Sequence, residues 1–216
     1  MPVEVKICGL KTAETVEAAV LGGARYVGFV FFGPSPRNLD GAQAARLASL
    51  VPAGVAKVGL FVEPGDVILD SILGEVDLDM VQLHGSESPG RVAAVKALTG
   101  CAVIKAVPLS GPADLESARA FEGAADRLLF DAKPAHGEET GRPGGNALSF
   151  DWSLLAGQDF ALPWMLAGGL DAGNLAQAMA ESGADTVDIS SGVEDGPGEK
   201  NADEIKAFLA AAAELP

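Results

Sequence analysis

Residues 164–192 read WMLAGGLDAGNLAQAMAESGADTVDISSG, and this stretch decides the fold. An apolar run, Trp164–Ala167, is followed by a glycine pair, an alanine-rich segment with helical spacing and a second apolar run, Thr186–Ile189. A short continuous apolar run is typical of a strand that is buried on both faces. Two such runs separated by one helix indicate a strand–helix–strand unit with parallel strands.

The same unit recurs outward along the whole chain. We expect eight strands, at Val3–Ile7, Tyr26–Phe31, Val55–Val62, Leu78–Leu83, Ala102–Val107, Arg127–Phe130, Trp164–Ala167 and Thr186–Ile189. We expect helices at Thr12–Leu21, Gly41–Leu50, Pro64–Leu73, from Pro89 onward, and at Ala113–Phe121, Ser149–Leu155, Asp171–Ser182 and Ala202–Ala213. A Gly- and Pro-rich loop, Ala132–Leu148, interrupts the rhythm.

Eight units predict an α/β protein with one domain over residues 1–216, a single (βα)8 TIM barrel. A doubly wound open sheet is the structural alternative. Its dinucleotide signature, G-x-G-x-x-G, does not follow the first strand.

Composition and charge restrict the class of partner. Apolar residues make up 48% of the chain and aromatic residues only 6%, which favours an aliphatic core. The net charge of −15 argues against nucleic acid, which requires clustered basic residues. Two cysteines, Cys8 and Cys101, are too few for a disulfide framework. With no secretion signal or membrane span in the sequence, we expect a cytoplasmic protein without a membrane partner.

Polar residues terminate several of the predicted strands, and a barrel brings these ends to one rim. Cys8, His84 and Asp131 follow the first, fourth and sixth strands, and Arg37 lies in the loop after the second. Taken alone, Cys8 is more typical of a small buried hydrophobe, and His84 of a structural or capping residue. Asp131 and Arg37 fit ordinary loop roles as well as functional ones.

Small residues follow strands seven and eight: Gly168 and Gly169, then Ser190, Ser191 and Gly192. In many barrels these two loops, with the start of a short helix, bind a phosphate through backbone N–H groups. Tight turns are the alternative explanation. Strands six, seven, eight and one are consecutive around the rim, so a phosphorylated sugar bound there would lie between Asp131 and Cys8.

Seven segments of the chain form a recognisable series of motifs: Lys6-Ile7-Cys8-Gly9, Gly28-Phe29-Val30-Phe31, Ser35-Pro36-Arg37, Val58-Gly59-Leu60-Phe61, Gln82-Leu83-His84-Gly85, Leu166-Ala167-Gly168-Gly169 and Asp188-Ile189-Ser190-Ser191-Gly192-Val193-Glu194. In residues and in order they resemble the motifs of one family, the phosphoribosylanthranilate isomerases of tryptophan biosynthesis. One segment departs from the family pattern. Gly144-Gly145-Asn146-Ala147 stands where members usually carry Gly-Gly-Thr/Ser-Gly before Phe-Asp-Trp.

The resemblance implies an Amadori rearrangement of N-(5-phosphoribosyl)anthranilate without cofactor or metal. It implies Asp131 as general acid and Cys8 as general base. It also implies substrate contacts by Arg37, to the anthranilate carboxylate, and by His84; Lys6 shares the face of Cys8 and is placed with them. Phosphate contacts are expected from Gly144, Gly145, Gly168, Gly169, Ser190, Ser191 and Gly192. We expect a monomer or a homodimer with a small-molecule substrate.

Three other functions are compatible with a phosphate-binding barrel. The related isomerase of histidine biosynthesis would be expected to have Asp at the end of the first strand, where Cys8 stands here. Indoleglycerol-phosphate synthase would need a lysine at the end of the third or fifth strand, whereas Lys105 lies inside the fifth. A barrel that binds phosphate without catalysis would not need both Cys8 and Asp131.

Overall fold

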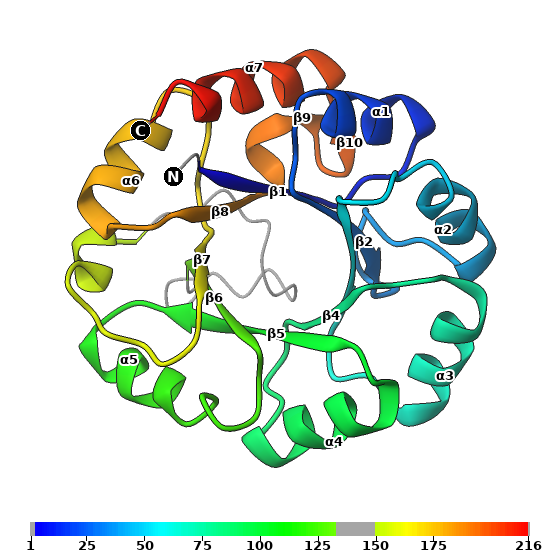
Figure 1. Cartoon of the computed structure of the whole chain (residues 1–216), viewed down its shortest axis with the longest axis horizontal. Coiled ribbons are helices and arrows are strands. Elements are labelled where there is room, and N and C mark those ends of the chain that lie inside the picture. The colour runs from blue at the N-terminus through cyan, green and yellow to red at the C-terminus, as the bar shows by residue number, and fades with distance from the viewer. Residues whose placement is uncertain (1–2, 133–149, 216) are drawn as a thin grey trace.

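A computed structural model of the chain describes residues 3–132 and 150–215. Eight parallel strands form a closed barrel in sequence order, β1 to β8, with β8 returning to β1 (Figure 1). The strands are β1 (Glu4–Cys8), β2 (Tyr26–Phe31), β3 (Ala56–Phe61), β4 (Met80–Leu83), β5 (Ala102–Leu109), β6 (Arg127–Ala132), β7 (Trp164–Leu166) and β8 (Thr186–Ile189). The predicted TIM barrel is therefore confirmed, and the open sheet is excluded.

Helices surround the barrel as an outer ring (Figure 1). They are α1 (Ala13–Leu21), α2 (Gly41–Ala48), α3 (Asp66–Glu75), α4 (Pro89–Thr99), α5 (Pro112–Arg119), α6 (Leu175–Ser182) and α7 (Ala202–Ala213), with 3-10 turns η1 (Trp152–Leu155) and η2 (Ser191–Val193). Among the helices of the described residues, none has the combined length and apolar character that a membrane crossing requires.

Several helices begin at side-chain caps that the sequence predicts. The Thr12 side chain accepts a hydrogen bond from Thr15 N, and Asp40 forms a capping box with Gln43. Helix α6 begins later than the predicted Asp171, because the Asp171 carboxylate accepts hydrogen bonds from the N–H groups of Gly173 and Asn174 and holds a turn there. The helix predicted at Ser149–Leu155 is only the 3-10 turn η1.

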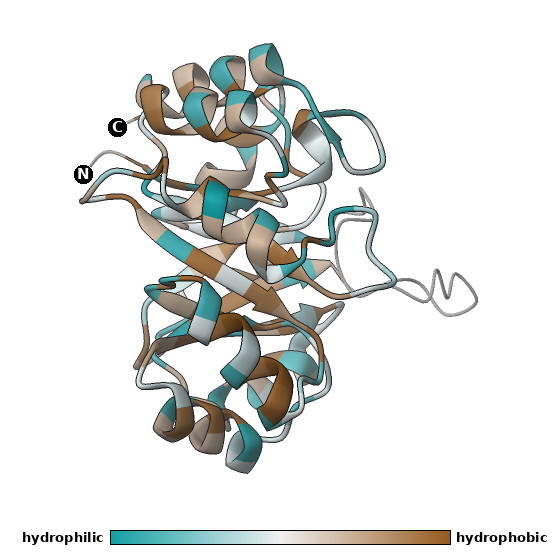
Figure 2. Ribbon diagram, turned by 90° about the vertical axis from the view of Figure 1, so that its right-hand side faces the viewer, coloured by the Kyte–Doolittle hydropathy of each residue, from teal (hydrophilic) through white to brown (hydrophobic). Residues whose placement is uncertain are grey.

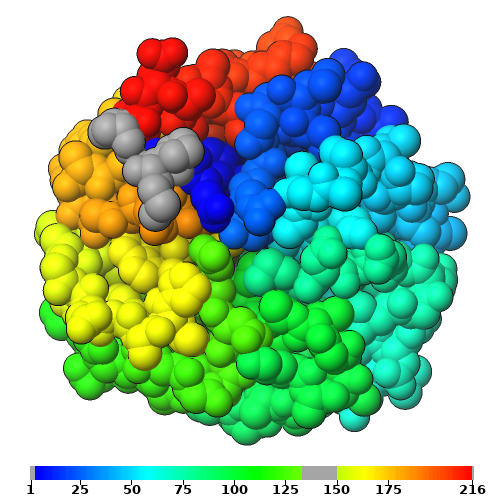
Figure 3. Space-filling view, viewed as in Figure 1, coloured from blue at the N-terminus to red at the C-terminus, as the bar shows by residue number. Residues whose placement is uncertain are grey.

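Side-chain alternation along the strands divides the core into two parts. Outward-facing residues such as Ile7, Phe29 and Val103 pack against the helices in one large cluster. The barrel interior is filled by a second cluster, which consists of Tyr26, Val58, Ile104, Ala106, Leu129, Met165 and Ala167. In Figure 2 the largely brown strands lie between helices that alternate between brown and teal, and Figure 3 shows atoms meeting across the middle of the ring.

A small antiparallel hairpin interrupts the connection from β8 to α7. It consists of β9 (Glu194–Gly196) and β10 (Glu199–Lys200), and in the view of Figure 1 it projects between α7 and α1. The sequence prediction did not include this hairpin. The loop predicted at Ala132–Leu148 lies, apart from Ala132, outside the described residues, as do Gly144 and Gly145.

Candidate active site

Three of the predicted site residues lie at one end of the barrel, the carboxyl end of the strands. Cys8 ends β1, Asp131 is next to last in β6, and His84 directly follows β4. Their side chains point inward, because Cys8 packs with the interior residues Val30 and Leu60 while the alternating residues of each strand face the helices. The fold thus gathers the polar strand ends, as predicted.

Cys8 sits beside a buried ion pair. The Lys6 ammonium, which is fully buried, donates a hydrogen bond of 2.8 Å to the Asp188 carboxylate on the neighbouring strand β8. Lys6 and Asp188 are also paired in register across the two strands. Gly28 on β2 is paired with Cys8 on β1, and a Cβ atom at Gly28 would lie 2.9 Å from the Cys8 sulfur. Glycine at position 28 therefore leaves the room that the thiol occupies.

The protonation of this group follows from its burial. Burial raises the pKa of the Cys8 thiol above its usual value, and the nearby Lys6 ammonium only partly opposes that rise. Burial also opposes the charge on Lys6, but Asp188 and Cys8 together raise the pKa of Lys6 above its usual value. The free protein therefore holds a neutral thiol next to a charged lysine.

Asp131 takes part in a chain of three side chains. His84 Nε2 lies 3.1 Å from Asp131 Oδ2, and His84 Nδ1 lies 2.8 Å from the side-chain nitrogen of Gln82. The second oxygen of Asp131 accepts a hydrogen bond from the N–H of Ala132 at 2.9 Å. Gln82 is fully buried. His84 is thus held between β4 and β6, with its imidazole against the carboxylate of Asp131.

Arg37 makes a two-pronged contact with a carboxylate of its own chain. Its Nε and Nη2 atoms donate to the two oxygens of Glu194, each at 2.7 Å. Both side chains are buried, with 9% and 3% of their areas exposed. The Lys200 ammonium also bonds to Glu194 and donates to the carbonyl of Ser190 at 3.0 Å. Burial lowers the pKa of Lys200 to about 8, and Arg37 and Lys200 hold that of Glu194 below its usual value despite burial.

The residues predicted to bind phosphate lie in the loops after β7 and β8. Gly168 and Gly169 both have left-handed backbone, at φ 88° and 66°. Ser191 and Gly192 belong to the turn η2, and the Ser190 hydroxyl donates to the carbonyl of Cys8 at 3.2 Å. The two loops flank the space between the ends of β6 and β1. Phosphate binding there stays a prediction.

Lys105 is directed away from this site. Its ammonium donates to the carbonyl of Gly85 at 2.6 Å and to the Glu87 carboxylate at 2.8 Å, and it lies over the ring of Phe121. Burial lowers the pKa of Lys105, although Glu87 opposes this. The neighbours of Lys105 on the strand, Ile104 and Ala106, face the barrel interior. Lys105 is therefore a structural residue between the barrel and the helices.

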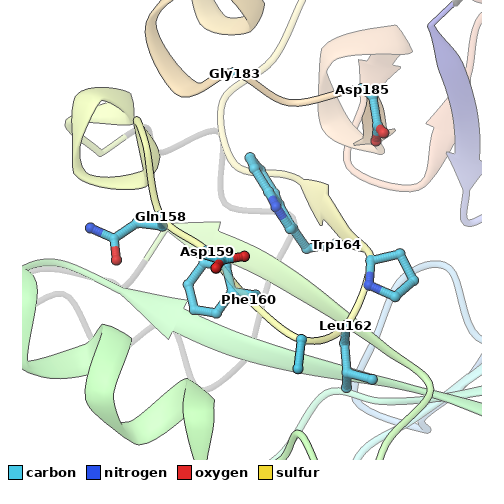
Figure 4. Close-up of a pocket in the computed structure, with 9 residues that line it drawn as sticks. Gln158, Asp159, Phe160, Leu162, Trp164, Gly183 and Asp185 are labelled. Carbon is cyan, nitrogen blue, oxygen red and sulfur yellow. The ribbon is translucent and has the colours of Figure 1, made fainter.

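A separate cavity of about 280 Å³ opens at the opposite end of the barrel. Its lining includes Phe160, Trp164 and Asp185, which precede or begin β7 and β8, and Figure 4 shows these side chains around it. Barrel enzymes place their chemistry at the carboxyl end of the strands, whereas the amino end serves stability. In residues 3–132 and 150–215, no group of three His, Cys, Asp or Glu side chains is arranged to hold a metal ion.

Four residues of this site were not among the predicted site residues: Gln82, Asp188, Glu194 and Lys200. Gln82 and Asp188 carried a usable signal, since each is a polar residue inside an otherwise apolar strand. Glu194 and Lys200 flank a Gly- and Pro-rich turn, which is typical of a hairpin. Their partner, Arg37, lies 157 positions before Glu194, so no short-range pattern in the sequence indicates the contact.

Comparisons with known proteins agree with this geometry. Residues 5–211 match the family model described as N-(5'phosphoribosyl)anthranilate (PRA) isomerase. A relative of that name from Rhodospirillum centenum is 58% identical over 215 residues, covering 100% of both chains. One from Paracoccus denitrificans is 54% identical over 212 residues, covering 98% of both chains.

Solved structures of the same family superpose closely. The phosphoribosyl anthranilate isomerase of Thermotoga maritima has a TM-score of 0.87 and 35% identity, with 99% of this chain and 100% of that chain covered. A second structure, an isomerase in complex with reduced 1-(o-carboxyphenylamino)-1-deoxyribulose 5-phosphate, has a TM-score of 0.84 and 33% identity at the same coverage. Sequence, barrel and strand-end residues thus agree, and the chain belongs to the N-(5'-phosphoribosyl)anthranilate isomerase family.

Proposed function

We propose that the carboxyl end of this barrel carries out the Amadori rearrangement of N-(5'-phosphoribosyl)anthranilate, with Asp131 as general acid and Cys8 as general base. One observation carries the assignment of roles. The ionisable side chains of Asp131 and Cys8 lie at the carboxyl ends of β6 and β1. They flank the glycine- and serine-rich loops after β7 and β8. A sugar whose phosphate lies at those loops has a proton donor on one side and an acceptor on the other.

In the first step Asp131 gives its proton to the oxygen of the furanose ring. The bond between that oxygen and C1 breaks, and the electron pair of the anthranilate nitrogen forms an iminium ion with C1. The hydrogen bond between His84 and Asp131 fixes the carboxyl group in place, and with its proton on Nε2 His84 supports the carboxylate that the transfer leaves behind.

In the second step Cys8 removes the proton from C2. The electron pair of the C–H bond forms a C1–C2 double bond and neutralises the iminium nitrogen. The enol then becomes the ketone as C1 gains a proton and the C2 hydroxyl loses one. Because burial favours the neutral thiol in the free protein, Cys8 has to lose its own proton to solvent before this step, and the thiolate has to be stabilised in the complex. The iminium charge of the substrate and the Lys6 ammonium both act in that direction.

Binding is divided between the two ends of the substrate. We assign the anthranilate carboxylate to Arg37 and the wall beside the aromatic ring to His84. The phosphate is assigned to the loops that carry Gly168, Gly169, Ser190, Ser191 and Gly192, together with Gly144 and Gly145. Lys6 is fully buried, so its contribution is electrostatic, through Cys8.

We propose that residues 1–216 act as one catalytic domain in the cytoplasm, without cofactor or metal, as a monomer or a homodimer. A related structure is described as monomers generated from the dimeric isomerase of Thermotoga maritima. Sedimentation equilibrium of the purified chain distinguishes the two states.

The direct test is the loss of anthranilate-type fluorescence when purified protein meets freshly generated N-(5'-phosphoribosyl)anthranilate. We expect rapid turnover in buffer with chelator and no added cofactor. A well-folded protein that leaves the fluorescence at its uncatalysed rate would contradict the proposal.

A further inference from the structure

We propose that the β9–β10 hairpin is a positioning device for Arg37, and that Glu194 and Lys200 thereby set the preference of the site for a substrate that carries a carboxylate. The inference rests on the proposed role of Arg37 and concerns residues outside the catalytic pair. It depends on three features: the orientation of the guanidinium group, the charge of the cluster and the docking of the hairpin.

Among residues 3–132 and 150–215, the guanidinium contact with Glu194 leaves one edge of Arg37 for a ligand. Glu194 accepts from Nε and Nη2, each at 2.7 Å, so it occupies one of the two forked edges of the guanidinium group. The other edge, formed by Nη1 and the second hydrogen of Nη2, has the same geometry and suits a second carboxylate. Glu194 therefore fixes the plane and the direction in which Arg37 presents its remaining donors.

Arg37, Glu194 and Lys200 form a charged cluster in which Glu194 does not neutralise all of the positive charge. An isolated arginine–glutamate pair is neutral and would attract an anion weakly. Lys200 adds a second positive charge on the same carboxylate, and its side chain is only 2% exposed. Arg37, Glu194 and Lys200 together therefore carry a net charge of about +1 while Lys200 is protonated, which favours an anionic ligand in a dry setting.

Docking of the hairpin against the loop that carries Arg37 completes the arrangement. At Gly198, in the hairpin turn, a Cβ would lie 2.7 Å from the carbonyl oxygen of Pro36, and φ is +83°. Its N–H donates to Glu194 at 3.1 Å. On the other side, a Cβ at Gly9 would lie 2.5 Å from Cδ of Arg37, so the arginine stem crosses the chain directly after Cys8. Two glycines thus allow the hairpin, the arginine and the end of β1 to pack closely.

The test compares two ligands by calorimetric titration. One is reduced 1-(o-carboxyphenylamino)-1-deoxyribulose 5-phosphate, and the other is the same compound without the carboxyl group. Glu194→Gln removes a negative charge, so the charge of the cluster alone would not weaken an anionic ligand. We nevertheless expect the Kd of the carboxylate ligand to rise about tenfold, because Arg37 loses the partner that fixes the direction of its remaining donors. The Kd of the second ligand should stay within about twofold, since it makes no use of Arg37.

A double-mutant cycle shows whether Glu194 acts through Arg37. In an Arg37→Met background, Glu194→Gln should cause no further loss for the carboxylate ligand. Gly198→Ala alters no charge but pushes the hairpin away from Pro36, and a loss in the same direction is expected. Glu116→Gln, which removes an exposed Arg119–Glu116 pair on α5, is the matched control and should leave both Kd values unchanged.

Equal weakening of both ligands in Glu194→Gln would overturn the inference, as would an undiminished effect in the Arg37→Met background. A wild-type protein that binds neither ligand contradicts the proposed function and the inference together. If the wild type binds the carboxylate ligand more tightly than the ligand without the carboxyl group, and Glu194→Gln shows the same preference, only the inference fails. Thermal unfolding of each variant confirms that the measured protein is folded.

Discussion

His84 Nε2 lies 3.1 Å from Oδ2 of Asp131, and this contact couples the acid to the tautomer of the imidazole. With Gln82 donating to Nδ1, the proton of His84 sits on Nε2 and points at a carboxylate. A half-turn of the Gln82 amide would present its oxygen to Nδ1–H, and Nε2 would then accept from a protonated Asp131. The Gln82 oxygen has no hydrogen-bond partner within residues 3–132 and 150–215. The hydrogen-bonded series Gln82–His84–Asp131 can therefore accommodate both protonation states of Asp131.

Gln82→Met should remove this support without touching the substrate. We expect kcat to fall about tenfold, as for the loss of one oriented hydrogen bond to a reacting group, with KM within about twofold. A fall in thermal stability with unchanged kcat would show that Gln82 is only structural.

Asp131→Asn should lower kcat by about 10²- to 10⁴-fold, because an amide cannot give the ring oxygen a proton. The affinity for the reduced product analogue should change only a few fold, since the ring is already open in that ligand. Stopped-flow fluorescence and calorimetry measure the two quantities. Retention of most activity would exclude Asp131 as the acid.

Cys8→Ala should lower kcat to a similar extent, about 10²- to 10⁴-fold, with ligand affinity retained. Because burial raises the pKa of Cys8, alkylation of its thiol by iodoacetamide should be slow at neutral pH and accelerate only in the alkaline range. The measurement is best made in a Cys101→Ala background, which leaves one thiol. Rapid alkylation at pH 7 would contradict the neutral thiol.

Lys6→Met should destabilise the fold, because it leaves the Asp188 carboxylate buried without a partner. We expect a loss of about 3–5 kcal/mol in the free energy of unfolding, measured with urea. Adding Asp188→Leu should recover much of that loss, since both charges are then gone. Asp77→Asn, which breaks the Lys57 ion pair at a carboxylate that is 93% exposed, is the control and should cost little.

The binding of the carboxylate ligand should weaken as pH rises through about 8. Lys200 is charged below this pH and neutral above it, so the cluster with Arg37 and Glu194 goes from a net positive charge to none. The titratable or charged groups that affect Lys200 are Glu194 on its own hairpin, Arg37 from the loop after β2, and Cys8 from β1. Titration in a Cys8→Ala variant removes the thiol from the comparison. A pH-independent Kd, or an unchanged dependence in Lys200→Met, would contradict this assignment.

Much of the barrel could be predicted because its signals are local. Each strand is an apolar run, and caps such as Thr12 and Asp40 mark where helices begin. The order of strand ends around the rim then follows from topology, which is why Cys8 and Asp131 could be placed at the same end. The late start of α6 was missed because the carboxylate of Asp171 competes for the N–H groups that would open the helix.

The partners of the site residues could not be predicted in the same way. Lys6 and Asp188 lie on the first and last strands, respectively, and meet only because the barrel closes. Glu194 reaches Arg37 through a hairpin whose packing depends on the close approach of Gly198 to Pro36. Such contacts are properties of the closed three-dimensional arrangement, and no periodicity in the chain encodes them.

The outward direction of Lys105 also determines which new chemistry this barrel could acquire. A lysine amine that forms a covalent imine with a carbonyl substrate has to point into the barrel interior. On β5 the lysine would therefore have to stand at position 104 or 106, where Ile104 and Ala106 face the interior. Moving the amine by one residue would leave Glu87 buried without its cation. Conversion to imine chemistry would therefore take at least two coordinated substitutions, and the ion pair on the outside of the barrel is a barrier to that evolutionary change.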